Sequence, residues 1–120
     1  EIIIDSDFHI GNLSNGLPVC IYKFACEENS SYTVSWVDSY EGKDALMNLL
    51  NDEGLENQIC CDVKVSVYSE NKTHIVCENQ DSGYVNPPSF TAENSGYYFI
   101  EILPYSDDPN SRGYFAVKLN

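Results

Sequence analysis

The sequence predicts an all-β fold, a jelly-roll-like antiparallel β-sandwich of about seven or eight strands with one short helical or irregular insertion. Short runs alternate apolar and polar residues with the two-residue period of a half-buried strand. Clusters of Asn, Asp, Ser and Gly separate these runs and indicate turns. The length of 120 residues suits one hydrophobic core, so we expect residues 1–120 to form a single β-sandwich domain.

Six runs follow the strand period. The clearest is CDVKVSVYS, in which Val63, Val65 and Val67 alternate with polar residues. Trp36 lies in the middle of another run, on its apolar side, so we expect it in the core. Pro87-Pro88 excludes a central strand at that point. The six predicted strand segments are 18–26, 31–39, 61–69, 74–78, 96–105 and 113–120.

Two segments depart from the strand pattern. Residues 1–12 lack regular alternation, and we expect them to form an N-terminal extension or linker. Residues 43–58 place Leu46, Leu49 and Leu50 at helical spacing, with Asn and Gly residues after them. This pattern predicts one short helix or a turn-rich insertion at the edge of the sandwich. We expect its leucines to pack on the sheet rather than to form a groove for a partner.

The charge of the chain excludes two classes of partner. Its 19 acidic and 6 basic residues give a formal net charge of −13, which repels nucleic-acid phosphates and anionic lipid headgroups. The sequence also has no apolar stretch near the roughly 20 residues that a membrane-spanning helix needs. We therefore expect no nucleic-acid binding and no membrane insertion. The acidity favours cations, basic partners or simply solubility.

The cysteine content predicts the compartment. Five cysteines are many for this length, and their spacing, with neither histidine near a Cys pair, does not fit a zinc site. Disulfides in an oxidising compartment are the preferred interpretation, which places the protein outside the cytoplasm, secreted or at the cell surface. The odd count leaves one thiol over, and the alternative is that all are buried free thiols. The candidates are Cys20, Cys26, Cys60, Cys61 and Cys77.

Motifs of enzyme active sites are absent. The sequence contains no G-x-S-x-G, H-E-x-x-H, phosphate-binding or dinucleotide-binding pattern. His9 and His74 have no Cys or Ser at a spacing that indicates a dyad. We therefore expect a protein without catalytic activity of its own. A small hydrolase that uses converging loop carboxylates is the least favoured alternative.

Two kinds of residue are candidates for a site. Acidic loops supply the oxygen ligands that Ca²⁺ prefers, although solvated loops explain the same composition. The candidate calcium ligands are Asp5, Asp7, Asp38 and Asp44. Aromatic rings at strand ends can stack on a sugar or grip a peptide, although some of nine tyrosines must be exposed in any fold. The candidate ligand-binding tyrosines are Tyr40, Tyr84, Tyr97 and Tyr105.

The order of the strands resembles that of a known family. The runs YKF, SYTVSWVDSYEG, DVKVSVYS, SFTAENSGYYFIEILPY and GYFAVKL, in this order, resemble the bacterial pre-peptidase C-terminal domain from about Leu13 to Leu119. The resemblance implies a β-sandwich attached to exported enzymes, or secreted beside them, that assists secretion, maturation or substrate attachment. Members of this family in bacterial collagenases bind collagen and use Ca²⁺ near their N-terminal segment, so the resemblance implies that this chain can do the same. The insertion at 43–58 and the five cysteines depart from the family pattern.

These observations together predict a non-catalytic accessory or binding module with a protein or glycan ligand, stabilised by calcium if the acidic loops form a site. We expect a monomer or one domain of a larger secreted protein. The alternative is a structural or adhesin subunit of a surface assembly, in which the odd cysteine links neighbouring subunits.

Overall fold

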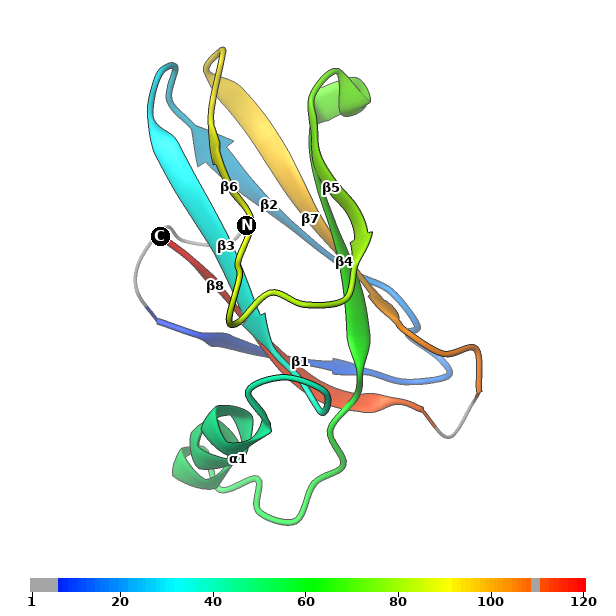
Figure 1. Ribbon diagram of the computed structural model, residues 1–120. Coiled ribbons are helices and arrows are strands. Elements are labelled where there is room, and N and C mark those ends of the chain that lie inside the picture. The colour runs from blue at the N-terminus through cyan, green and yellow to red at the C-terminus, as the bar shows by residue number, and fades with distance from the viewer. Residues whose placement is uncertain (1–6, 109–110) are drawn as a thin grey trace.

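The computed structural model describes residues 7–108 and 111–120 and confirms the all-β sandwich (Figure 1). One antiparallel sheet has the strand order β1-β8-β3-β6, and the other has the order β2-β7-β4-β5. The strands are β1 (His9–Leu13), β2 (Cys20–Cys26), β3 (Ser31–Val37), β4 (Val63–Ser69), β5 (Ile75–Gln80), β6 (Ser89–Thr91), β7 (Gly96–Pro104) and β8 (Gly113–Leu119). The helix α1 (Lys43–Asp52) and the short 3-10 turn η1 (Glu70–Lys72) complete the described elements.

The six predicted runs correspond to β2, β3, β4, β5, β7 and β8. The strand β1 pairs with β8 along its length, so residues 9–12 belong to the sandwich and not to the predicted N-terminal extension or linker; residues 1–6 of that segment lie outside the described residues. The strand is not evident from its sequence, HIGNL, because Gly11 and Asn12 have low strand propensity. Gly11 is nevertheless required there, because a Cβ atom would clash with the Phe115 ring. The three-residue β6 begins directly after Pro88 and lies at a sheet edge, where proline is tolerated.

The core lies between the two sheets and is built from the inward-facing residues of every strand. Trp36 is 1% exposed, as predicted, and Phe24 and Phe115 are fully buried. At one end the core is aromatic, where the Phe90 ring stacks on Tyr98 with centroids 4.7 Å apart. Aromatic pairs of this geometry add to the free energy gained by burial.

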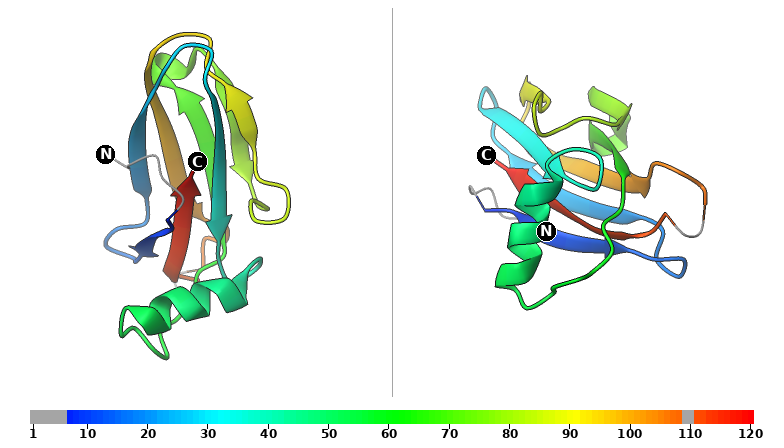
Figure 2. Two further views of the ribbon diagram at one scale, coloured as in Figure 1. Left: turned by 90° about the vertical axis from the view of Figure 1, so that its left-hand side faces the viewer. Right: turned by 60° about the horizontal axis from the view of Figure 1, so that its bottom comes forward.

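The helix α1 covers part of the outer side of the sheet β1-β8-β3-β6. Leu46 and Leu50 are fully buried and form a second cluster with Val37 and Ala116, so the leucines pack on the sheet as predicted. Figure 2 shows α1, the green helix, across one end of the sandwich beside the red strand β8. No helix in the described part of the chain is long and apolar enough to cross a membrane. Among residues 7–108 and 111–120, no α-helix lies on the outer side of the other sheet.

Gly83→Ala is expected to destabilise the fold, because a Cβ atom at this position would clash with the indole ring of Trp36. Forcing one extra carbon into a packed core costs about 2 kcal/mol. We expect the midpoint of thermal unfolding to fall by about 10 °C for a domain of this size. Gly16→Ala is the control, since nothing lies within 4 Å of a Cβ atom there. Equal midpoints for the two variants would contradict the packing described around Trp36.

Candidate functional site

The solvent-facing side of the sheet β2-β7-β4-β5, which we call the outer face, is the most extensive candidate site. Along β7, the buried residues Tyr98, Ile100 and Ile102 alternate with side chains that point to solvent. The neighbouring strands follow the same alternation, so one continuous surface forms. The outer face consists of Ile21, Lys23, Lys64, Tyr68, Ile75, Tyr97, Phe99, Glu101 and Leu103.

A row of side chains crosses the middle of the outer face. The strand register places Phe99 beside Lys23 on one side and beside Tyr68 on the other. Tyr68 in turn lies opposite Ile75 of β5. The Tyr68 and Phe99 rings stack with centroids 5.9 Å apart and an interplanar angle of 27°. Directly opposed side chains in an antiparallel sheet touch, so the row forms a nearly continuous apolar strip.

Lysine side chains flank the aromatic rings. Lys23 Nζ lies 4.7 Å from the centre of the Tyr97 ring, and Lys72 Nζ lies 4.9 Å from the centre of the Tyr68 ring. Cation–π contacts of this kind hold a ring and a lysine chain in a fixed relation. With Lys64, these lysines make up three of the six basic residues of the whole chain. The outer face is therefore much less negative than a protein of net charge −13 would suggest.

A hollow of about 210 Å³ opens beside the strip, between β4, β5 and β7. The pairing of β4 with β5 shifts register on both sides of Val67, which separates the two strands locally. The Tyr68 hydroxyl donates a hydrogen bond to Glu101 Oε2 at 3.4 Å. Burial, followed by the Glu101 charge, raises the pKa of Tyr68, so this hydroxyl remains a donor at neutral pH. Stacking surface and polar groups together suit the binding of a sugar ring or a peptide.

The four predicted ligand-binding tyrosines do not form one site. Tyr97 belongs to the outer face, whereas Tyr105 follows the opposite end of β7. The segments that carry Tyr40 and Tyr84 are joined near the start of α1, because Glu41 Oε1 accepts hydrogen bonds from the backbone N–H groups of Tyr84 and Val85 at 2.7 and 2.8 Å. Tyr40 is 62% exposed and Tyr84 is 44% exposed. Two of the four residues thus lie at a separate end of the molecule.

The predicted calcium ligands are also spread out. Asp5 lies outside the described residues, Asp7 is exposed ahead of β1, and Asp44 is exposed in the first turn of α1. Asp38, in contrast, is fully buried. The residues that the structure describes include no group of three or more His, Cys, Asp or Glu side chains that could hold a metal ion. Calcium binding remains a prediction from the sequence.

Asp38 has a structural role that the sequence did not reveal. Its Oδ1 accepts hydrogen bonds from the backbone N–H groups of Tyr40 and Glu41 at 3.0 and 2.8 Å. Its Oδ2 accepts one from the N–H of Val63 at 3.0 Å. A buried carboxylate is stable only with such partners. The Asp38 side chain therefore ties the end of β3 to the start of β4, across the insertion that contains α1.

Two further carboxyl groups lie near Asp38. Burial first, and then the charges of Asp38 and Asp81, raise the pKa of Asp62 to about 7. Within the described chain, Oδ1 of Asp62 and Oδ1 of Asp81 are buried without a hydrogen-bond partner. Neighbouring negative charges and partial burial both favour the protonated form of a carboxyl group. Asp62 therefore keeps its proton at pH values where an exposed Asp side chain is ionised.

All five cysteines are free, which corrects the prediction of disulfides. Cys26 and Cys61 are buried, and the other three are partly buried. Burial raises the pKa of Cys26 to about 12 and that of Cys61 to about 11, so both remain thiols. Cys61 donates a hydrogen bond to the carbonyl oxygen of Ser111 at 3.2 Å. The cysteines thus behave as small buried side chains, the alternative that the sequence left open.

The central pair of the outer face, Tyr68 and Phe99, was not among the predicted site residues. The sequence analysis selected tyrosines at strand ends, and both members of this pair lie within strands. The signal was present in the alternation, because Tyr68 shares the outward phase of Lys64 and Ser66 in the clearest run. Only the register of β4 against β7 shows that the two rings meet.

Replacing Asp62 with Asn is expected to reduce the pH dependence of stability. The folded state keeps a proton on Asp62 up to a pH of about 7, whereas the unfolded chain releases it near pH 4. Between these values the unfolded state binds fewer protons, so the free energy of unfolding falls as the pH rises. After discounting for solvent screening, we expect Asp62→Asn to raise the free energy of unfolding by about 1 kcal/mol at pH 8, relative to the unsubstituted protein. At pH 4 we expect little difference. Thermal melts at both pH values test this. Asp52→Asn, at an exposed position on α1, is the control and should show no such pattern.

Alkylation of the unfolded chain without a reductant is expected to modify all five cysteines, because none forms a disulfide. Intact-mass spectrometry measures the number of added groups directly. Iodoacetamide applied to the folded protein should leave Cys26 and Cys61 unmodified at first, since both are buried. A mass that shows only one or three modified cysteines after denaturation would contradict the free-thiol structure.

Comparisons with known proteins agree with this architecture. No family model matches the chain, and no curated protein matches it. The pre-peptidase C-terminal domain of a collagenase from Bacillus anthracis superposes with a TM-score of 0.62 over 98% of this chain and 91% of that one, at 16% identity. A protein from Sulfurospirillum deleyianum, at 10% identity over 97% of this chain and 99% of that one, reaches a TM-score of 0.38, too low to support an argument. The chain therefore has the β-sandwich fold of the pre-peptidase C-terminal domain, and the resemblance of the sequence is confirmed at the level of the fold.

Proposed function

We propose that this protein is a non-catalytic binding module that holds a protein or glycan ligand on its outer face. The observation that carries the proposal is the open strip of Phe99, Tyr68 and Ile75, which no α-helix of the described part of the chain covers. The Tyr68 and Phe99 rings are half-buried and Ile75 is exposed, and partly accessible aromatic side chains with polar groups around them are typical of surfaces that bind other molecules. The opposite sheet has a comparable outer side, but α1 packs over part of it.

The fold supports an accessory role beside an exported enzyme. The similar domain from Bacillus anthracis is part of a collagenase, so this β-sandwich occurs next to a peptidase there. We infer an extracytoplasmic location for this protein, and the same likeness supports it. The cysteines no longer contribute to that inference, because free thiols occur in reducing compartments as well. They also give no support to a surface subunit that is linked to its neighbours through an odd cysteine.

Binding to insoluble probes tests the proposal. We would incubate the chain with fibrillar collagen, chitin and cellulose, and measure the fraction that sediments with each. Tyr68→Ala and Phe99→Ala are each expected to weaken binding about tenfold to the probe with which the unsubstituted protein sediments. A tenfold change corresponds to roughly 1.4 kcal/mol, the contribution expected of one stacking contact.

Tyr105→Ala is the matched control, because Tyr105 is 53% exposed but follows the end of β7, away from the row that Phe99 and Tyr68 form. Circular dichroism and the unfolding midpoint of each variant show whether the fold is intact. Binding that survives both outer-face substitutions, or that only Tyr105→Ala weakens, would place the ligand elsewhere on the molecule.

A further inference from the structure

A second cavity lies at one end of the sandwich, where the β4–β5 hairpin and the turn between β6 and β7 come together. Its volume is about 230 Å³, which is enough to enclose the end of one long side chain. Apart from Tyr97, it shares no residue with the outer face or with the predicted sites. The lining residues are Ser69, Glu70, Thr73, His74, Glu93, Asn94, Ser95, Gly96, Tyr97 and Tyr98.

One wall of this cavity is aromatic and fixed in position. The His74 ring meets the Tyr98 ring edge-on, with centroids 5.9 Å apart, and also packs against Phe90 at 6.2 Å. His74 Nδ1 and the Tyr98 hydroxyl form a hydrogen bond of 2.8 Å. The His74 backbone N–H donates to Ser69 Oγ at 2.7 Å, which secures the same residue from the other side. A ligand therefore meets a preformed surface and does not have to order it.

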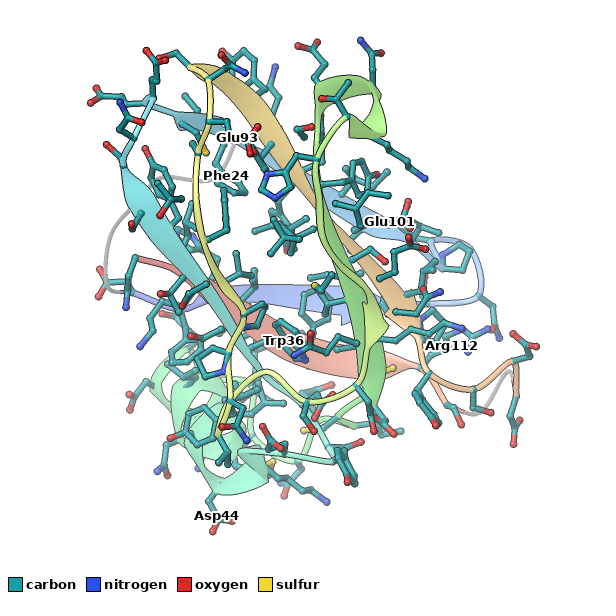
Figure 3. All side chains as sticks on the ribbon, turned by 45° about the horizontal axis from the view of Figure 1, so that its top comes forward. Phe24, Trp36, Asp44, Glu93, Glu101 and Arg112 are labelled. Carbon is teal, nitrogen blue, oxygen red and sulfur yellow. The ribbon has the colours of Figure 1, made fainter. Side chains whose placement is uncertain are left out.

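Two carboxylates from different elements line the same cavity. Glu70 comes from η1, and Glu93 comes from the turn between β6 and β7, which Figure 3 shows at the end of the sandwich. In the described part of the chain, neither carboxylate forms an ion pair, and no Lys or Arg lines the cavity. The lysines of the neighbouring strand and turn, Lys23 and Lys72, lie over the rings of Tyr97 and Tyr68.

We propose that this cavity binds the cationic end of a Lys or Arg side chain from a protein partner. Two carboxylates without ion pairs attract such a group. The Tyr97 ring, which already lies beside Lys23 Nζ, borders the same cavity. A neutral glycan offers no cation to this site. The net charge of −13 also favours the approach of a basic polypeptide.

The cavity and the outer face adjoin, because Tyr97 borders both. A polypeptide on the outer face can thus place one basic side chain into the cavity while its apolar groups contact Tyr68 and Phe99. This inference rests on the proposed function for the position of the rest of the ligand. It narrows that ligand from a protein or glycan to a protein segment that carries a basic side chain beside apolar ones.

The cavity can be tested without the macromolecular partner. We would titrate the ¹⁵N-labelled full chain with Nα-acetyl-lysine methylamide and record amide shifts by NMR. Nα-acetyl-norleucine methylamide, which has a similar chain without the ammonium group, is the matched probe. The lysine derivative is expected to shift the amides of residues 69–74 and 93–98, and the norleucine derivative is not. Raising the salt to about 0.5 M should reduce the shifts by screening the carboxylates.

Variants define the binding groups. Glu93→Gln and Glu70→Gln are each expected to weaken binding of the lysine derivative at least threefold. The double variant is expected to abolish the amide shifts that this derivative causes. Glu56→Gln, which removes an exposed carboxylate outside the cavity, should have no effect. Equal shifts with both derivatives, unchanged binding in the double variant, or shifts of the same amides by Ca²⁺ and not by the lysine derivative would each overturn the proposal. Tyr68→Ala is expected to leave this titration unchanged, because Tyr68 does not line the cavity. The titration therefore tests the cavity independently of the proposal for the outer face.

Discussion

The structure depends above all on the alternation along β7. This strand pairs with β2 on one side and with β4 on the other, so it fixes the position of the whole sheet. Its inward residues Tyr98, Ile100 and Ile102 are buried in the core, and its outward residues form the centre of the outer face. A slip of one residue would place the core side chains in solvent and destroy both features at once. Stability and the candidate binding surface therefore share one constraint.

The two sheets differ in how their outer sides are used. The helix α1 buries Leu46 and Leu50 against the sheet β1-β8-β3-β6, while Asp38 holds the chain on both sides of the insertion in place. The insertion thus removes one apolar surface from solvent and leaves the other sheet open. The half-buried Tyr68 and Phe99 rings remain partly accessible on this open sheet, which is the surface on which we propose that a ligand binds.

The charges are distributed in a way that fits this division. The chain is strongly acidic, yet Lys23 and Lys64 lie on the outer face and Lys72 of η1 reaches over its Tyr68 ring. At the end of the sandwich, the carboxylates of Glu70 and Glu93 line a cavity without a basic residue. A partner with apolar groups and a basic side chain complements both regions. A partner of uniform negative charge, such as a nucleic acid, does not.

The sequence by itself determined the sandwich and six of its strands, and it located the insertion, for which it left a short helix and a turn-rich segment open. Alternation, turn residues and leucine spacing are local properties of the chain. It missed β1 and β6, which have weak strand propensity and exist through pairing with β8 and β3. Tertiary structure alone decided that the cysteines remain unpaired and that Asp38 binds backbone N–H groups. It also brought Tyr68 to Phe99 and placed Glu70 and Glu93 on one cavity. The Asp38–Val63, Tyr68–Phe99 and Glu70–Glu93 pairs each bring together residues far apart in the chain, and only the tertiary arrangement of the strands and turns places them side by side.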